Sequence, residues 1–86
     1  MIHRTDKNQA EIVDYLRRTG RTVISLSQVG GGCPDILVGY RGVNFLFEIK
    51  SERGKLSESQ VEMHDNWRGK IHVVRSIEDA EEILRE

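Results

Sequence analysis

Two acidic side chains and one lysine stand inside apolar segments of this 86-residue chain: Asp35, Glu48 and Lys50. Charged groups in apolar surroundings are costly unless a partner compensates them, so they are the first place to look for chemistry. Side chains on a strand alternate between its two faces, so Glu48 and Lys50, two positions apart, point the same way. If a hairpin joins the two segments, Asp35 can lie beside Glu48.

The proximity of these two carboxylates depends on the length of the turn near Gly42. A two-residue turn of Arg41 and Gly42 places Asp35 directly opposite Glu48, and a two-residue turn one position earlier makes the acids diagonal neighbours on one face. Either turn brings the carboxylates within roughly 5 to 8 Å of each other. A three-residue loop would instead place them on opposite faces of the hairpin.

Neighbouring carboxylates repel, so one of them protonates unless a cation lies between them. Mg²⁺ suits such a pair because it takes oxygen ligands, keeps several waters and is commonly held by one or two carboxylates. Asp35 and Glu48 would be ligands, and the main-chain carbonyl of Ile49 could add a third oxygen. Lys50 would orient a water or stabilise the charge of a phosphate. The alternative is a metal-free ion cluster in which Lys50 bridges the two acids, but the apolar context and the preceding Pro34 favour a metal site.

These residues resemble the signature of the PD-(D/E)XK nucleases, and in particular the stand-alone, phage-type members of the VRR-NUC family. The resemblance rests on Pro34-Asp35, on Glu48-Ile49-Lys50 and on the stretch from Lys55 to Gln60, and it extends over nearly the whole chain. It implies a restriction-endonuclease-like fold, dependence on Mg²⁺ or Mn²⁺, and cleavage of DNA phosphodiesters. The minimal members, and the similar Holliday junction resolvases, act as homodimers on branched DNA.

Helical spacing relates Gln60 to Met63, His64 and Trp67, which follow it at three, four and seven positions and so share one stripe. We expect Met63 and Trp67 in the core and His64 as a half-buried, hydrogen-bonded side chain rather than a base. Gln60 can complete a capping box with Ser57. The family resemblance also favours a role for Gln60 at the metal's water or the scissile phosphate, and both roles can hold together.

Gln9 lies at the centre of the apolar stripe that Ile12, Val13 and Leu16 define on the first helix. In the similar junction resolvases a glutamate occupies this position, and this chain departs from that pattern. Gln9 would therefore support a metal water or a phosphate without lending charge, or it would be buried and cap a neighbouring strand.

The formal net charge is −1, which is unusual for a DNA-binding protein until its distribution is considered. Residues 76–86 hold five of the fourteen acidic residues and one of the thirteen basic residues, which leaves twelve basic against nine acidic residues in 1–75. Basic side chains there could contact phosphates, and the glycine run could allow close approach of the DNA backbone. The candidates are Arg17, Arg18, Arg21, Gly31, Gly32, Arg53 and Lys55, and the alternative is an ordinary solvated surface.

Length and composition predict a single domain over residues 1–86. A chain of this size buries only about 60 to 65% of its unfolded surface, so dimerisation would enlarge its core. One cysteine excludes an intramolecular disulfide and multi-cysteine zinc sites, which favours the reducing cytoplasm. No apolar run reaches transmembrane length, so no membrane association is expected.

The chain is predicted to have the order αβββαβα, an α/β arrangement with a mixed four-stranded sheet flanked by helices. Three strands in a meander precede a parallel crossover, which should be right-handed. The expected elements are a helix over 7–18 capped by Thr5 or Asp6, strands over 22–27, 34–40 and 43–50, a helix from Ser57 to near Gly69, a strand over 71–75 and a helix opening at Ser76.

The sequence therefore predicts a homodimeric, Mg²⁺-dependent endodeoxyribonuclease that hydrolyses phosphodiesters by in-line attack of a metal-activated water, selectively on four-way or other branched DNA. Asp35, Glu48 and the Ile49 carbonyl would hold the ion, Lys50 would stabilise charge and Gln60 would assist. One alternative is a non-catalytic module that binds branched DNA on the same scaffold. Another, suggested by the acidic C-terminal segment, is a regulatory protein with no nucleic-acid partner.

Overall fold

The computed structural model describes residues 6–85, and the order of its elements is the predicted αβββαβα. The predicted capping residue Thr5 and the side chain of Asp6 lie outside the described part. The elements are α1 (Asp6–Arg18), β1 (Thr22–Ser25), β2 (Ile36–Tyr40), β3 (Val43–Ile49), α2 (Glu58–Asn66), β4 (Ile71–Val74) and α3 (Ile77–Leu84).

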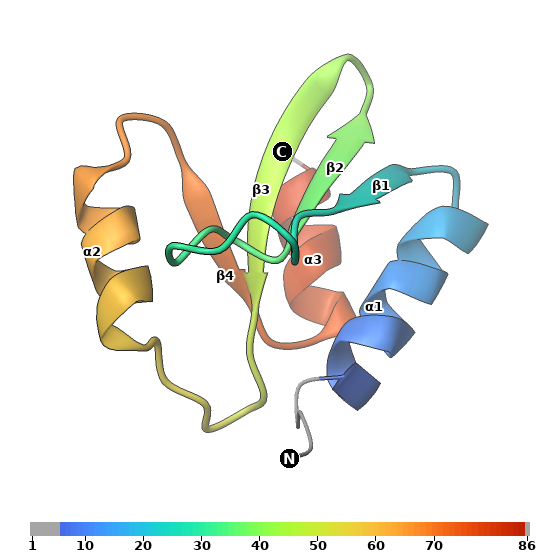
Figure 1. Cartoon of the computed structure of the whole chain (residues 1–86). Coiled ribbons are helices and arrows are strands. Elements are labelled where there is room, and N and C mark those ends of the chain that lie inside the picture. The colour runs from blue at the N-terminus through green and yellow to red at the C-terminus, as the bar shows by residue number, and fades with distance from the viewer. Residues whose placement is uncertain (1–5, 86) are drawn as a thin grey trace.

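The four strands form one mixed sheet in the order β1-β2-β3-β4 (Figure 1). β1, β2 and β3 pair antiparallel as a meander, and β4 pairs parallel to β3 after the chain has passed through α2. Both features agree with the topology predicted from the sequence. Because β3 and β4 run parallel, their carboxyl ends meet at the same edge of the sheet.

One face of the sheet carries the core, which α1 and α3 cover. Ile12 and Leu16, four positions apart on α1, and Ala80 and Leu84, four apart on α3, are buried. They pack with alternate residues of the strands, namely Ile36, Val38, Phe47, Ile49 and Val74. The alternation leaves Glu48 on the opposite face of the sheet.

That opposite face is approached by α2, which Figure 1 shows set apart from α1 and α3. The helix starts with the predicted capping box, in which the Ser57 side chain accepts from the Gln60 amide and the Gln60 side chain accepts from the Ser57 amide. The helix contains no fully buried residue. The prediction that Trp67 belongs to the core is wrong: the helix ends at Asn66, Trp67 has an extended backbone, and this side chain is 47% exposed.

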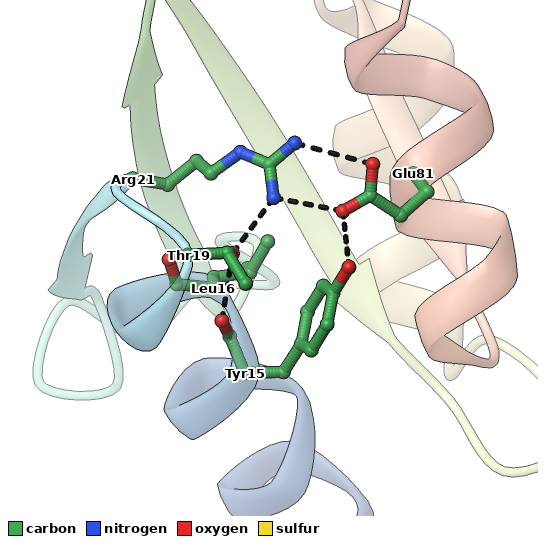
Figure 2. Close-up of polar contacts among 5 residues, drawn as sticks. All are labelled: Tyr15, Leu16, Thr19, Arg21 and Glu81. Atoms are coloured by element: carbon green, nitrogen blue, oxygen red, sulfur yellow. Dashed lines mark hydrogen bonds and ion pairs between the residues drawn. The ribbon is translucent and has the colours of Figure 1, made fainter.

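A polar cluster ties α1 to α3 on the core side (Figure 2). The Arg21 guanidinium donates to both carboxylate oxygens of Glu81, at 2.8 and 3.2 Å, and to the Thr19 hydroxyl at 2.8 Å. The Tyr15 hydroxyl donates to the same carboxylate at 2.5 Å. These bonds from Arg21 and Tyr15 lower the pKa of Glu81 to about 2. Arg21 is only 8% exposed, and its guanidinium is bonded to Glu81. The prediction that Arg21 contacts DNA is therefore wrong.

The described helices are too short to cross a bilayer. The longest of them, α1, has 13 residues, whereas a transmembrane helix needs about 20 apolar residues.

Candidate functional site

The turn between β2 and β3 is one of the two-residue turns left open by the sequence. Tyr40 pairs with Val43, so Arg41 and Gly42 form the turn. Both have positive φ, 53° and 78°, as a type I′ turn requires. The recorded pairing ends at Ile36 and Phe47, one residue short of Asp35 and Glu48, so this turn brings the two acids to the same end of the hairpin.

Glu48 is 1% exposed, and its carboxyl lies within hydrogen-bonding reach of Asp35. The pKa of Glu48 is raised to about 8. Burial is the largest cause, followed by the hydrogen bond to Asp35 and the negative charge of Asp35, while the positive charge of Lys50 acts in the opposite direction. Near neutral pH the metal-free pair therefore holds a proton. A cation at this place would remove the cause of the shift, because it would compensate both charges.

Asp35 is held by the backbone on both sides of β2. Its side-chain Oδ2 accepts from the Ile49 amide at 2.7 Å, and its own amide donates to the Phe47 carbonyl at 3.0 Å. Its carbonyl accepts from the Leu26 amide of the segment after β1 at 2.9 Å. The aspartate is therefore fixed in place by three hydrogen bonds to two neighbouring segments, β3 and the segment after β1.

The backbone pairing of β2 and β3 departs from its register just before β2. The last recorded pair is Ile36 with Phe47, and the Asp35 amide donates to the Phe47 carbonyl, which does not continue that register. The Ile49 N–H points toward Asp35, to whose side chain it donates. Because the N–H and C=O groups of one strand residue point to the same neighbour, the Ile49 carbonyl lies on this side of β3. Its role as a metal ligand stays a prediction.

α2 presents two side chains, one helical turn apart, to the two oxygens of Glu48. Gln60 Nε2 donates to Oε2 at 3.1 Å, while Gln60 Oε1 accepts from the Ser57 amide at 2.8 Å. One amide therefore completes the predicted capping box and also binds Glu48, whereas its predicted role at the metal's water or the scissile phosphate stays a prediction. His64 Nε2 lies 3.8 Å from Glu48 Oε1, beyond hydrogen-bonding distance. Both of these atoms are buried and without a hydrogen-bond partner.

The donor set fits a hard divalent cation. Glu48 Oε1 is a buried acceptor without a donor, and Asp35 adds a second carboxylate. The Ile49 carbonyl is the neutral oxygen that the sequence predicts as a third ligand. Among the described residues no three His, Cys, Asp or Glu side chains are grouped to hold a metal. Two carboxylates with water and phosphate in the remaining positions is the arrangement in which Mg²⁺ is commonly bound, whereas a structural zinc site takes four protein ligands.

Lys50 follows the last residue of β3 and is half-buried beside these acids. Its amide donates to the Val74 carbonyl at 3.0 Å, and its own carbonyl accepts from Asn8 Nδ2 of α1 at 3.0 Å. Asn8 is not among the residues predicted for the site. Gln9, which is among them, is half-buried and lines a hollow of about 250 Å³ between α1 and β1 with Val13 and Arg17 among others.

The remaining basic candidates lie in two places. Arg53 and Lys55 are exposed in the loop that follows Lys50. Arg17 and Arg18 are exposed at the far end of α1, where Arg17 donates to the Val23 carbonyl at 3.0 Å and Arg18 pairs with Asp14 at 2.9 Å. The pair nearer the carboxylates is therefore Arg53 and Lys55.

The glycines at positions 30–32 differ in their surroundings, and one of them packs closely against α2. Gly32 has φ +81° and lies so close to α2 that a Cβ there would overlap the Ser59 carbonyl oxygen. Gly31, with φ +64°, faces open space and is exposed. The backbone at Gly31 thus remains accessible to a ligand, whereas the absence of a side chain at Gly32 is needed for packing.

Cys33 lies beside the carboxylates but is not a nucleophile. Burial raises the pKa of its thiol, and the negative charges of Glu48 and Asp35 add to the rise. The thiol therefore stays protonated near neutral pH, and a protonated thiol is a poor nucleophile.

Two contacts near the carboxylates were not predicted from the sequence. His64 was expected to share a stripe with Gln60 and to be half-buried and hydrogen-bonded, but its approach to Glu48 was not expected. Arg75 donates to main-chain carbonyls of the loop after Lys50, and no local pattern in the sequence marks that contact.

Comparison with known proteins identifies solved structures of similar fold, one of which matches the chain in size. No family model matches the chain, and no curated protein matches it. The solved chain is described as a VRR_NUC domain; it superposes with a TM-score of 0.70 at 25% sequence identity, and the match covers 95% of each chain. The predicted restriction-endonuclease-like α/β fold is confirmed by this likeness and by the mixed four-stranded sheet with its three helices.

Proposed function

The chain belongs to the VRR-NUC family of nucleases, and we propose that it is a metal-dependent DNA endonuclease that hydrolyses phosphodiester bonds. The observation that carries this proposal is the pair formed by the buried Glu48 and the half-buried Asp35. One oxygen of Glu48 has no donor, and the pKa of Glu48 is raised to about 8. Such a carboxylate pair has no evident structural benefit without a cation, whereas it suits a site that fills with Mg²⁺ or Mn²⁺.

The protein groups have separate roles in this proposal. Asp35, Glu48 and the carbonyl of Ile49 hold the ion, and Gln60 holds the Glu48 carboxylate in the orientation needed. When bound, the ion supplies a Lewis acid that stabilises charge on the phosphate and makes the attacking water more acidic. Lys50 places a second positive charge beside the same phosphate.

The DNA backbone would be held by exposed basic side chains. Arg53 and Lys55 follow Lys50 directly and so lie beside the site. Each phosphate contact of this kind releases counterions, so affinity should fall steeply as salt is raised. Arg17 and Arg18 could contact a more distant part of a branched substrate.

We further propose that the protein acts as a homodimer on four-way or other branched DNA. A twofold axis relates two such sites, which suits paired cuts on opposite strands. An apolar hollow of about 600 Å³, lined by Val29, Leu37, Leu46, Met63 and Trp67 among others, separates α2 from the sheet and the loop before β2. A second copy of this small chain is the occupant that we expect there, since burying these side chains would enlarge the core.

A cleavage panel tests the proposal. The protein is incubated with four-way, flap, single-stranded and linear duplex DNA in Mg²⁺, Mn²⁺ or EDTA, after its mass in solution has been measured. We expect a dimeric mass and metal-dependent cutting that favours the branched substrates. Lys50→Ala should lower the cleavage rate by about 100- to 1000-fold, whereas Arg85→Ala, which removes an exposed basic side chain at the end of α3, should not.

Cleavage in EDTA, or full activity in Lys50→Ala, would contradict the mechanism. Binding of branched DNA without cleavage and without Mn²⁺ uptake would instead indicate a non-catalytic binding module. A monomeric mass would contradict the dimer alone.

A further inference from the structure

One side chain, Arg75, organises the turn that follows the predicted catalytic lysine. Its Nη1 donates to the carbonyl of Ser51 at 2.6 Å and to that of Gly54 at 2.8 Å. A third, longer contact reaches the carbonyl of Glu52 at 3.3 Å. A single guanidinium therefore gathers three main-chain oxygens of the segment 51–54, a segment with no regular secondary structure of its own.

The parallel pairing of β3 and β4 explains why Arg75 can reach this turn. Ile49 pairs with Val74, and the Lys50 amide donates to the Val74 carbonyl, so Arg75 leaves β4 beside the point where Lys50 leaves β3. The backbone of Arg75 is itself fixed, because its amide donates to Asp79 Oδ2 at 2.9 Å. The guanidinium is thus anchored to the rigid end of the sheet and not to another loop.

The turn held by Arg75 carries Arg53, and Lys55 follows it directly. Both side chains are exposed, and they have no carboxylate partner among the described ion pairs. Gly54 between them leaves little room: a Cβ there would lie 3.0 Å from the Ser51 hydroxyl oxygen. The shape of the turn therefore depends on Arg75 on one side and on the absence of a side chain at Gly54 on the other.

We propose that Arg75 is a positioning residue for DNA binding: it holds the turn 51–54 so that Arg53 and Lys55 face the DNA backbone next to Lys50. This inference rests on the proposed nuclease function and assigns a cause to the geometry of its DNA contact. Arg75 acts through the turn, because its Nη1 hydrogens are directed to these carbonyls. Without it, the two exposed side chains would sample many orientations, and fixing them again on binding would cost conformational entropy.

A double-mutant cycle tests the proposal, with affinity for a labelled four-way DNA measured in EDTA so that no cleavage occurs. The variant Arg53→Gln/Lys55→Gln should weaken binding and reduce the slope of log affinity against log salt by about 2. Arg75→Gln should weaken binding by about 3- to 10-fold in the wild-type chain. In the Arg53→Gln/Lys55→Gln background the same change should have an effect below about 1.5-fold, because the groups through which it acts are gone.

Two controls separate positioning from loss of charge and from loss of folding. Arg85→Gln removes the same charge from the end of α3 and should change affinity by less than about 1.5-fold. Gly54→Ala alters the turn without changing any charge, and it should weaken binding with the same dependence on Arg53 and Lys55. Amide hydrogen exchange over residues 51–55 should become faster in Arg75→Gln while Mn²⁺ affinity stays within about twofold.

The outcomes distinguish this inference from the function on which it rests. If Arg75→Gln weakens binding equally in both backgrounds, Arg75 contacts DNA directly and the inference is wrong. Unchanged affinity in Arg75→Gln and Gly54→Ala would also overturn it while leaving the nuclease proposal intact. A wild-type protein that binds no DNA would overturn the proposed function and this inference together. If Arg75→Gln does not fold, the Gly54→Ala series decides the question by itself.

Discussion

Glu48 combines nearly complete burial with a neighbouring acid, and this combination sets the behaviour of the whole site. The pKa of Glu48 is raised to about 8 by burial first and by Asp35 second. In the metal-free protein the pair therefore carries one proton at neutral pH. Metal binding must displace that proton, because the ligand form of a carboxyl group is the ionised form.

The first prediction concerns this proton. Mn²⁺ binding at pH 7 should release close to one proton per chain, and the affinity should rise with pH up to about 8. Calorimetric titrations in buffers of different ionisation enthalpy measure the release directly. Binding without proton release would indicate that Glu48 is already ionised.

The same shift fixes a sign for stability. Because the pKa of Glu48 is higher in the folded chain than its ordinary value of 4.5, the folded chain retains a proton that the unfolded chain loses between about pH 4.5 and 8. This group therefore makes the free energy of unfolding fall as pH rises through that range. In Glu48→Gln this dependence should disappear, which urea unfolding at several pH values can measure.

At the scale of elements, α2 is the weakly attached part of the site. It contributes no fully buried residue, and its contacts to the rest of the fold include Gln60 with Glu48 and the close approach of Gly32 to Ser59. The glycine run before Asp35 is therefore part of the support for the helix that holds Glu48. The motif residues and the helix depend on each other through one small backbone contact.

A pair of glycine substitutions tests that dependence. Gly32→Ala places a Cβ on the Ser59 carbonyl, whereas Gly31→Ala places one in open space, and both residues have positive φ. Both variants should lose about 1 kcal/mol from backbone strain, and Gly32→Ala should lose about 1 to 3 kcal/mol more from the clash. Thermal unfolding compares the two directly. Equal losses would mean that α2 can move away at no cost.

The contact between α1 and α3 gives a second prediction at this scale. The pKa of Glu81 is lowered to about 2 by its hydrogen bonds to Arg21 and Tyr15. The folded value lies below the ordinary value of 4.5, so the stabilisation is present above about pH 4.5 and is lost as pH falls toward 2. Glu81→Gln should destabilise the protein by about 2 kcal/mol at pH 7 and much less near pH 2. A loss that does not depend on pH would assign the contact to packing alone.

For the molecule as a whole, the features that could be predicted from the sequence are those that depend on residues close together in the chain. Strand alternation, the Ser57 capping box and the order of helices and strands each depend on residues close in the chain, and the structure agrees with them. The turn length stayed open because Arg41 is an unusual residue for a position with positive φ.

The wrong predictions have a common physical cause, which is dependence on distant partners or on where a helix ends. Arg21 was taken for a surface residue because its partner Glu81 is 60 positions away. Trp67 was placed in the core because the helix was expected to continue to Gly69, whereas it ends at Asn66. Arg75 could not be identified because the carbonyls that it binds lie more than 20 positions earlier in the chain.

The central claim is that Asp35 and Glu48 together hold a divalent cation, and calorimetric titration of Mn²⁺ into the protein tests it most directly. We predict saturable uptake by the wild-type chain and by Asp14→Asn, which alters an exposed aspartate on α1. Asp35→Asn should abolish the uptake although it preserves the shape of the side chain. No uptake by the wild-type protein, or equal uptake by Asp35→Asn, would contradict the claim.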